Sequence, residues 1–586
     1  MAKKIKIKTK KPKHSDADVL FDTALQYYQS GNLQQAEMLC MQILDKQPNH
    51  ADAWHLFGVI AGECGHYADS ISHINRAVSI NPGIFFYYFN LGNAYKDNGM
   101  MEEAIENYKK SSRLKPDFTN ALISLGIALM DKGILDEAIE NFRKALKLSP
   151  GNADIYNNLG LALELNGDAD TAIEYLERAI ELQPDSAEAL NNIGHLLVNK
   201  SMFEGAIEKF EKALRIKPDY AEAYSNLGYV FKLKGRIDRA IENLEKALIL
   251  QPEFALAHLN LGMAHLLAKE FRKGWEEYEW RLKTIKVQPL TKPKWDGSLL
   301  EGKTILVCAE QGYGDVLQFV RYLPKLSEDF GAKKVLFISQ KGLEQVLMES
   351  DLRAEILDAE TSVESLAYDT NIHLLSLPRI FRTNLENIPF KQKRYLKANP
   401  EKVEWYRKKF FSTTSFSPTP SAFVPTPYTL SPAPLKLGIF WQGNPALKPD
   451  MRRSMPLHHF YSICRLPNVE TYSLQKGYGI EQLKEVPEDI KISNLGETFN
   501  DFSDTAAAIE NLDLVITVDT AIGHLSGGLG KKTWILLPSH AEWRWHLDMD
   551  YSPWYEDVRL FRHKELGKKD WEEMMERVAE ELSRKQ

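Results

Sequence analysis

The chain has 586 residues, 44% of them hydrophobic, which is enough apolar material for several buried cores; at roughly 150 residues per domain, this length predicts about four units. A charged fraction of 26% excludes disorder over the whole chain, and a formal charge of −7 argues against a general nucleic-acid binder. No apolar run is long enough to span a membrane, and the basic start, residues 1–16, lacks the apolar stretch of a secretory signal. We therefore expect a cytoplasmic protein with no membrane span, no nucleic-acid partner and a disordered basic tail.

The cysteines give no sign of a disulfide framework or of a metal site. There are four of them, and they include no C-x-x-C pair. They are Cys40, Cys64, Cys308 and Cys464. Buried thiols in a reducing compartment explain them best, and we expect no metal and no resident cofactor.

Residues 17–288 have an internal period of 34, in which one proline and one glycine recur in each unit. The two series are Pro48, Pro82, Pro116, Pro150, Pro184, Pro218, Pro252 and Gly58, Gly92, Gly126, Gly160, Gly194, Gly228, Gly262. Glycine lets two helices approach closely where they cross, and proline ends the second helix of a unit. The period resembles the tetratricopeptide repeat, a pair of antiparallel helices. It predicts eight units coiled into an all-α superhelix, with the last unit, 255–288, as a cap.

An amide recurs at the sixth position of the units in this array. The residues are Asn90, Asn158, Asn192, Asn226 and Asn260, with Ser124 in the fourth unit. Asparagine is a mediocre helix former, so helix propensity does not explain the recurrence. One interpretation is hydrogen bonding between neighbouring repeats. The other is a ladder of amides that binds an extended peptide, which resembles the ladder in the tetratricopeptide-bearing O-GlcNAc transferases.

Beyond residue 289 the periodicity changes to short apolar runs separated by helical segments. The runs are 303–308, 334–339, 435–441, 470–475, 513–519 and 532–538. Such runs predict parallel sheets covered on both faces. A Ser/Thr/Pro-rich stretch divides the region, so we expect one α/β lobe over 289–405, a linker over 406–434 and a second lobe over 435–586. Two such lobes in series form a cleft at the carboxyl ends of their strands.

The first segment expected at this cleft is 309–324. Gly312 and Gly314 follow the strand that ends at Cys308, and we expect positive φ angles there, in a tight strand-to-helix turn. Asp315 starts the helix, where its carboxylate either faces the helix dipole or acts as a general base. The third glycine of a dinucleotide-binding motif is missing.

The second segment, 438–457, is a strand followed by a polar loop. The loop includes Gln442, Asn444, Lys448, Arg452 and Arg453. Basic side chains beyond a strand end suit a diphosphate, because arginine can bind two oxygens at once. A solvated turn in which one arginine pairs with a nearby carboxylate is the alternative.

The third segment, 518–538, carries Asp519 and Thr520 directly after a strand and before a helix of small residues that starts at Ala521. The N–H groups at such a helix start can bind an anion. His524, one turn into the helix, either contacts a phosphate or ribose or is a hydrogen-bonded structural histidine.

Together and in this order, the three segments resemble glycosyltransferase family 9, the heptosyltransferase-like enzymes, and more closely the bacterial proteins that join tetratricopeptide repeats to such a domain. Further stretches that carry the resemblance are WDGSLLEGKTILV, YDTNIHLLSLPRIF, RRSMPL, EWRWHLD and SPWYEDVRLFR. The resemblance implies an α/β GT-B fold of two Rossmann-like lobes. It also implies metal-independent, inverting transfer from a nucleotide diphosphate sugar, which is a co-substrate and not a cofactor.

The resemblance also implies residue roles. Asp315 matches the catalytic base of the heptosyltransferases. The residues expected to bind the nucleotide sugar are Gly312, Gly314, Gln442, Asn444, Lys448, Arg453, Asp519, Thr520, Ala521 and His524. Two positions depart from the pattern: Leu447 stands where relatives usually have histidine, and Ala521 where a glycine often follows the Asp-Thr pair.

We therefore predict a hexosyl-, heptosyl- or N-acetylhexosaminyl-transferase that recruits its acceptor through the repeats, with a protein Ser or Thr hydroxyl as first choice. Transfer to a glycan or a lipid-linked acceptor is one alternative. A non-catalytic scaffold, whose α/β half has lost its chemistry, is the other. The sequence does not identify the sugar, the nucleotide, the acceptor or the oligomeric state.

Overall fold

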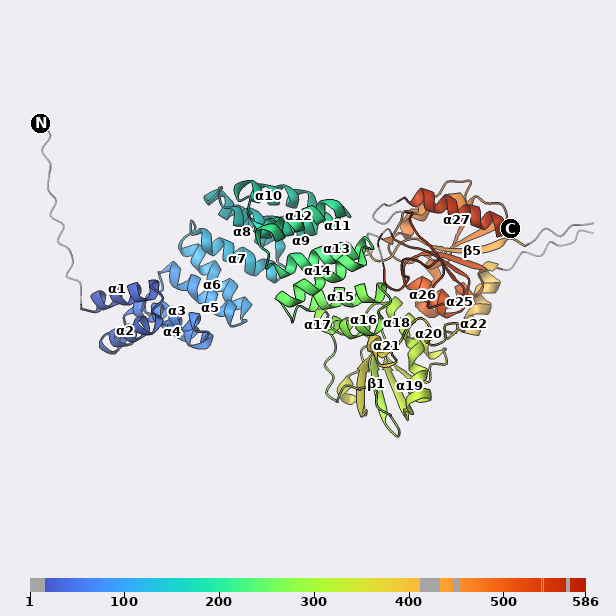
Figure 1. Ribbon diagram of the computed structural model, residues 1–586, viewed down its shortest axis with the longest axis horizontal. Helices are drawn as coiled ribbons and strands as arrows, with labels where there is room; N and C mark the ends of the chain where they lie inside the picture. Colours follow the sequence, from blue (N-terminus) through green and yellow to red (C-terminus); the bar gives the residue numbers. More distant parts are fainter. Residues whose placement is uncertain are drawn as a thin grey trace, which may run out of the picture. The chain divides into compact units, whose positions relative to one another are not determined.

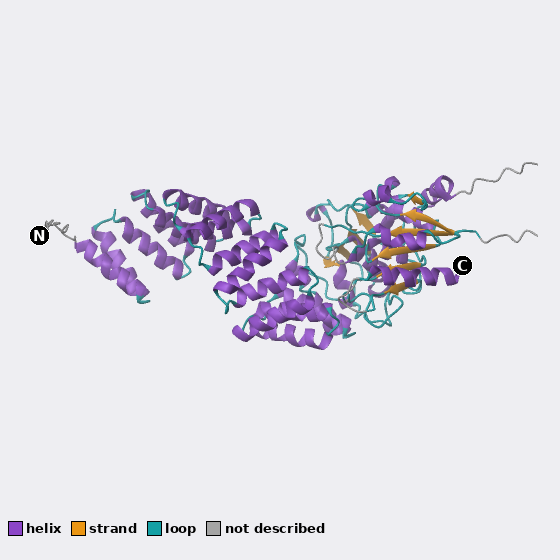
Figure 2. Ribbon diagram, turned by 90° about the horizontal axis from the view of Figure 1, so that it is seen from above, coloured by secondary structure: helices purple, strands orange, loops and turns teal. Residues whose placement is uncertain are grey.

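The computed structural model describes residues 16–411, 433–445, 453–538, 540, 542–564 and 570–585. The chain forms two compact units, one ending at Leu196 and the other starting at Leu197. In the described part of the first unit every regular element is a helix, whereas the second unit combines helices with two parallel sheets (Figure 1). Figure 2 shows that the strands are confined to the half of the chain that follows the repeats. Among the described helices, none is both long and apolar enough to span a bilayer.

The first unit is a series of antiparallel helix pairs. Its helices are α1 (Asp16–Gln29), α2 (Leu33–Lys46), α3 (Ala51–Glu63), α4 (Tyr67–Ile80), α5 (Phe85–Asp97), α6 (Met101–Leu114), α7 (Thr119–Asp131), α8 (Leu135–Leu148), α9 (Ala153–Leu165), α10 (Ala169–Leu182) and the first part of α11 (Ala187–Asn199). The recurrent glycines lie where the two helices of a pair cross. A Cβ atom on Gly126 would lie 2.6 Å from the ring of Phe142, sixteen residues later, so only glycine allows this approach. The packing role expected for this glycine series is therefore confirmed.

The second unit continues with α12 (Phe203–Ile216), α13 (Ala221–Leu233), α14 (Ile237–Leu250), α15 (Ala255–Leu267), α16 (Phe271–Tyr278) and α17 (Arg281–Thr284). The second helix of the last pair is thus broken into two short pieces. Trp275 and Tyr278 of α16 are almost fully buried, and they share one hydrophobic core with the α/β half. The final repeat therefore belongs to the same packed body as the two sheets.

The first sheet is parallel, with the strand order β3-β2-β1-β4. Its strands are β1 (Thr304–Cys308), β2 (Lys334–Ile338), β3 (Glu355–Leu357) and β4 (Thr370–His373), and its helices include α18 (Tyr313–Phe319), α19 (Leu323–Phe330), α20 (Glu344–Met348) and α21 (Leu377–Ile380). Both faces of β1 are buried: Ile305 and Val307 pack into one core, and Leu306 and Cys308 into another. This burial explains why the strand is a continuous apolar run.

The second sheet is also parallel, with the order β10-β9-β8-β5-β6-β7. Its elements are β5 (Leu435–Phe440), α24 (Tyr461–Cys464), β6 (Val469–Ser473), β7 (Ile492–Asn494), α25 (Phe502–Glu510), β8 (Leu514–Val518), α26 (Ala521–Gly528), β9 (Thr533–Leu536), β10 (Val558–Phe561) and α27 (Trp571–Lys585). β8 is buried along its whole length, with Val515 in one core and Leu514, Ile516 and Val518 in the core on the opposite side.

All six predicted strands are present, and the parallel α/β arrangement is confirmed. Four strands of three or four residues were not predicted: β3, β4, β7 and β10. They were missed because such short segments carry too few residues to establish an alternation pattern. The prediction of buried thiols is wrong for Cys64, which is exposed because it lies in the turn after α3, beside Gly65.

Two predicted regions fall mainly outside the described residues. These are the basic tail, of which residues 1–15 are not described, and residues 412–432 of the predicted linker. The start of that predicted linker is helical, because α22 (Pro400–Tyr406) is followed by a π-helix, η4 (Arg407–Phe411).

Candidate active site

Each sheet has a point at which the strand order reverses. In the second sheet, β5 and β8 are neighbours, and the chain leaves them toward opposite edges. In the first sheet, β1 and β4 stand in the same relation. Ligands of open parallel sheets bind outside the carboxyl ends of the strands at such points. The segments that follow β1, β5 and β8 are the three that carry the sequence-predicted site residues.

The two lobes touch where Gly314 of α18 meets the start of α26. A Cβ atom on Gly314 would lie 2.9 Å from Cδ2 of His524 and 3.6 Å from Cα of Ala521. The prediction of positive φ at Gly312 and Gly314 is wrong: Gly312 has φ −65°, and neither glycine is among the positive-φ residues. Gly314 is needed because the helix of the other lobe lies against it. The chain turns from β1 into α18 with ordinary backbone angles.

Asp315, the predicted base, forms an ion pair with Arg544 of the second lobe through its Oδ1 atom. The Arg544 guanidinium also donates to Oε1 of Glu542 at 2.7 Å and to Oε1 of Gln318 at 3.2 Å, and it lies 4.3 Å from the centre of the Trp543 ring. The Asp315 and Arg544 side chains are only 16% and 15% exposed. Arg544 therefore holds one carboxylate from each lobe where the two lobes meet.

The charges in this group depend on one another. Burial by itself would lower the pKa of Arg544, but the carboxylates of Asp315 and Glu542 outweigh it and raise the pKa, so the guanidinium stays protonated. Burial raises the pKa of Glu542, with the Arg544 cation opposing this shift and the Asp519 carboxylate adding to it. Arg544 is thus the cation that Asp315 and Glu542 share.

Asp519 and Thr520 lie where predicted, directly after β8, but both are bound by protein groups. Asp519 Oδ1 accepts a hydrogen bond of 3.1 Å from Nε1 of Trp545, and the hydroxyls of Thr520 and Thr517 are 3.2 Å apart. Helix α26 then starts at Ala521 without a side-chain cap on its first N–H groups. An uncapped helix start with a positive dipole end can bind an anion.

His524 is 4% exposed and packed on all sides. Its Nδ1 atom forms a 2.9 Å hydrogen bond with the Tyr555 hydroxyl, and its ring stacks on Trp545 with centroids 5.3 Å apart. Burial, together with the cations Arg544, Arg321 and Arg453, holds its pKa well below the usual value. His524 is thus neutral and hydrogen-bonded, as the structural interpretation of this histidine requires, and it also forms the lobe contact with Gly314.

The loop after β5 is described only in part, because Lys448 and Arg452 lie outside the described residues. Its first part is fixed by Gln475, which is fully buried and whose Oε1 accepts from the N–H groups of Trp441 and Gln442. The Gln442 side chain accepts a hydrogen bond of 3.0 Å from Gln482. Asn444 is exposed and Arg453 is half-buried.

The recurrent amides differ in their surroundings. Asn90 donates to Nε2 of His55 at 2.9 Å, and Asn192 donates to Oδ1 of Asn157 at 2.8 Å, in each case to the preceding repeat. Asn260 is buried and accepts a hydrogen bond of 3.4 Å from Lys232. Asn158 and Asn226 are half-buried. The first interpretation, hydrogen bonds between repeats, therefore holds for Asn90, Asn192 and Asn260.

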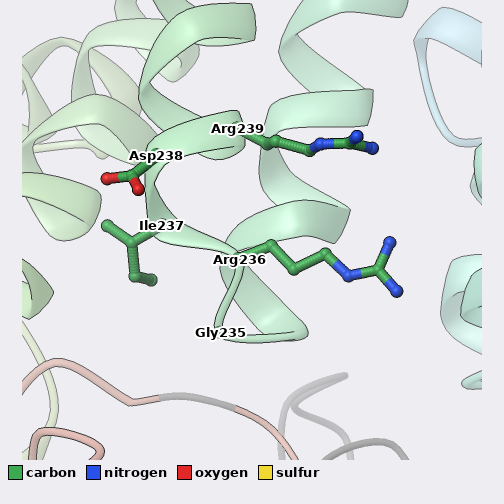
Figure 3. Close-up of a pocket in the computed structure, with 5 residues that line it drawn as sticks. All are labelled: Gly235, Arg236, Ile237, Asp238 and Arg239. Carbon is green, nitrogen blue, oxygen red and sulfur yellow. The ribbon is translucent and has the colours of Figure 1, made fainter.

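A hollow of about 430 Å³ lies elsewhere, at the turn before α14, and it is lined by residues 235–239 (Figure 3). The side chains of Arg236 and Arg239 point to one side of the turn, and that of Asp238 to the other. Arg236 pairs with Glu204 at 3.8 Å, and the Arg239 guanidinium lies 5.5 Å from the centre of the Phe231 ring. Because none of the predicted site residues lines the hollow, we do not assign it to the site.

Sequence reasoning missed Arg544 and Glu542, although it noted the stretch EWRWHLD that contains both. The available signal was two charged residues within a run of tryptophans, because charged groups among large apolar side chains have to be paired when they are buried. It also missed Gln475, whose role depends wholly on the fold. Among the described residues, no cluster of three or more His, Cys, Asp or Glu side chains is arranged to hold a metal ion.

Comparisons with known proteins identify the repeats. A family model described as "TPR repeat" matches residues 92–133, 126–167, 200–235 and 228–267. Two models described as "Tetratricopeptide repeat" match residues 153–186 and 51–84. Together with the helix pairs, these matches show that the chain carries tetratricopeptide repeats, a protein-interaction scaffold.

One curated relative and several solved structures are similar to this chain. The FlbA protein of Caulobacter vibrioides is 25% identical over 337 residues, which are 53% of this chain and 52% of FlbA, so the chain spans about half the length of this relative. A chain in the crystal structure of the APC/C hetero-tetramer Cut9-Hcn1 is similar, with 25% identity over 46% of this chain and 53% of that chain and a TM-score of 0.35. YrrB, described as "a TPR protein with an unusual peptide-binding site", is also similar, with 29% identity over 31% of this chain and 95% of that chain and a TM-score of 0.26. Because these TM-scores lie below 0.5, the assignment of the repeats rests on the family models and the helix pairs alone.

Proposed function

We propose that the α/β half is a GT-B glycosyltransferase domain that uses a nucleotide diphosphate sugar, and that the repeats hold the acceptor. The observation that carries the proposal is the contact between Gly314 and α26. This contact brings α18, which follows the first sheet's β1 and carries Asp315 in its first turn, beside the start of α26. Helix α26 follows β8 of the second sheet and starts at Ala521 without a side-chain cap. A base and an anion site on facing lobes are the two groups that transfer from a sugar diphosphate requires.

The donor diphosphate would bind at the start of α26. The first N–H groups of this helix are not capped by a side chain, and the dipole favours negative charge there. Arg453 and Arg544 lie close enough to His524, one turn into the helix, to help lower its pKa. Two cations near an uncapped helix start support a diphosphate better than they support a neutral ligand.

In the proposed reaction, Asp315 accepts the proton of the acceptor hydroxyl while the hydroxyl oxygen bonds to the anomeric carbon. The bond from that carbon to the diphosphate oxygen breaks, and the nucleoside diphosphate leaves with the bonding electrons. Because the ion pair with Arg544 uses Oδ1 of Asp315, we assign proton acceptance to Oδ2. Because the hydroxyl attacks the face opposite the diphosphate in a single displacement, the step inverts the anomeric carbon, and the helix start and the cations would stabilise the leaving group in place of a metal ion.

A second candidate is a non-catalytic scaffold, and one set of observations favours it. Asp315, Asp519 and Thr520, three of the proposed site residues, are all bound by protein groups. The two candidates differ in whether a nucleotide sugar binds, since a scaffold has no need of one.

The test is a thermal-shift screen of the full chain with UDP-, GDP-, ADP- and CMP-sugars, followed by a transfer assay with the nucleotide that binds. A ligand that binds only the folded state stabilises it, by about 3 kcal/mol when the ligand concentration is 100 times its Kd, and this raises the melting temperature. Asp315→Asn should keep the shift and lose at least about 100-fold in turnover, because it removes a general base. Asp351→Asn, at an exposed carboxylate of the same lobe, is the matched control. The absence of a shift with every nucleotide sugar would favour the scaffold.

The acceptor class is tested separately, by changing Asn158, Asn192 and Asn226 together to alanine. If an extended protein segment binds along these amides, transfer to protein acceptors falls while the donor-induced shift stays the same. Asn107 and Asn141, amides on the second helices of their repeats, provide control substitutions. Unchanged transfer to every protein acceptor would refute the peptide groove, whereas no transfer by the wild type to any protein would point to a glycan or lipid-linked acceptor.

A further inference from the structure

Arg281 of the short helix α17 is completely buried, at 0% exposure. Its guanidinium donates to Oε1 of Glu310 at 2.7 Å and to the Ser376 hydroxyl at 2.9 Å. A third bond, of 2.8 Å, goes to Glu279 beside it. Glu310 is the second residue after β1, and Ser376 lies in the segment after β4. One arginine of the repeat array therefore binds both strand-end segments at the point where the strand order of the first sheet reverses.

The same short stretch of chain is bound by two residues of the last repeat. Oε1 of Glu310 also accepts a hydrogen bond of 3.0 Å from the N–H of Leu375, so its carboxylate joins the segments after β1 and β4. Gln311, the next residue, accepts a hydrogen bond of 3.2 Å from the Tyr278 hydroxyl. Gly312 then precedes α18, the helix that carries Asp315. Contacts from the repeat thus reach the residues immediately before this helix.

The charges of Arg281 and Glu310 depend on each other, because both side chains are buried. Burial raises the pKa of Glu310, and the Arg281 cation opposes that shift. The side chains of this pair are 0% and 1% exposed, so neither charge can turn to water if the other is removed. Buried ion pairs of this kind add little net stability compared with an apolar pair, but they impose one geometry on the groups they join.

We infer that Arg281 is a positioning residue, through which the last repeat fixes the stretch 310–312 and hence the start of α18. The role of Asp315 as a base rests on the proposed function, whereas the fixing of this stretch does not. It follows that the repeats and the α/β half cannot be separated where the sequence periodicity changes, near residue 289, without releasing this part of the cleft.

The first test is hydrogen–deuterium exchange of the full chain, followed over residues 309–319. The variants are Arg281→Met, Arg281→Lys and the double variant Arg281→Met/Glu310→Gln. The double variant removes both buried charges, so it serves if the single substitution does not fold. We expect Arg281→Met and the double variant to raise exchange at 309–319 by about tenfold or more over the rest of the lobe, and Arg281→Lys to raise it less. The matched control is Arg272→Met, whose side chain in the preceding helix is 91% exposed.

Exchange at 309–319 that equals that of the Arg272→Met control, or that rises equally throughout the lobe, would overturn the inference. In the transfer assay, Arg281→Met or the double variant should lower kcat and leave donor binding unchanged, with Arg281→Lys restoring part of the turnover. Equal losses in donor binding and in kcat would also overturn the inference, because they would indicate a general structural role. If the wild-type chain binds no nucleotide sugar, the proposed function fails, and the exchange measurement still decides the role of Arg281.

Discussion

Arg544 in the second lobe and Asp315 in the first form an ion pair between residues 229 positions apart in the chain. The same guanidinium binds Glu542 at 2.7 Å, so it joins one carboxylate of each lobe. The residue proposed as the base is therefore oriented by a side chain of the opposite lobe.

Arg544→Met should lower the free energy of unfolding by about 3 kcal/mol, because it removes the ion-pair partner of two poorly solvated carboxylates. Urea unfolding measures this loss. The matched control is Arg465→Met, which breaks a surface pair with Asp489 whose side chains are 48% and 59% exposed, and it should leave the free energy of unfolding nearly unchanged because water screens the pair. If the two variants lose the same unfolding free energy, the buried pairs of Arg544 matter no more to stability than a surface pair.

Gly314→Ala should be destabilising, although alanine is the better helix former. The added Cβ would lie 2.9 Å from His524, whose ring is held by Tyr555 and Trp545 and cannot move away easily. We expect a cost of about 1 to 3 kcal/mol and a weaker stabilisation by nucleotide sugars, measured by thermal unfolding.

Gly312→Ala is the control for that substitution. A Cβ at Gly312 would come no closer than 3.6 Å to Oδ2 of Asp315, and the backbone φ of −65° suits any residue. Its cost should stay below about 1 kcal/mol, the size of an N-cap effect. If Gly314→Ala and Gly312→Ala lose the same stability, then the close approach of the other lobe is not the reason that position 314 requires glycine.

The stability of the second unit should fall as the pH drops below 6.5, because buried histidines, His373 and His546 as well as His524, are kept neutral in the fold. Burial, assisted by Arg281 and Lys294, lowers the pKa of His373 to about 4, and burial, assisted by Lys269, lowers that of His546 to about 4. The unfolded chain binds protons near pH 6.5 and the folded chain does not, so acid favours unfolding. Each histidine should cost about 2 kcal/mol between pH 7 and pH 5.

Denaturant unfolding at the two pH values measures this slope. The double variant His373→Gln/His546→Asn should lose about 4 kcal/mol less than the wild type between pH 7 and pH 5, whatever its stability at neutral pH. If the double variant loses as much unfolding free energy as the wild type between pH 7 and pH 5, other groups cause the acid sensitivity.

Ser201→Gly should stabilise the repeats. The turn between the two helices of a repeat uses glycine with positive φ at five successive units, from Gly31 to Gly167, and again at Gly235, but Ser201 occupies the equivalent place with φ 60°. A left-handed conformation costs a non-glycine residue about 1 to 2 kcal/mol, and glycine loses about 0.5 to 1 kcal/mol more entropy on folding. The net gain in the free energy of unfolding, measured with urea, should be about 0.5 to 1 kcal/mol.

The reverse change, Gly133→Ser, is the control, because the turn at Gly133 has open space around it. It should lower the free energy of unfolding by a similar amount, and a stabilising effect would contradict the explanation.

Much of the fold could be predicted from the sequence because its signals are local. The glycine and proline spacing predicted the helix pairs, and the packing of Gly126 on Phe142 supplies the physical reason for that spacing. Strands such as β1 and β8 were predicted because burial on both faces makes them continuous apolar runs. The short strands β4 and β10 were missed because they are recognisable mainly by their partners in the sheet.

The candidate site divides in the same way. By itself, the sequence determined which segments follow the strands, and therefore that Asp315, Asp519 and Thr520 lie at the carboxyl ends of the sheets. Only the tertiary structure decided that Arg544 pairs with Asp315, that His524 lies against Gly314, and that Arg281 joins two strand ends. These are contacts between residues far apart in the chain, and a buried charge or a missing side chain reveals its partner only when the fold has brought the two together.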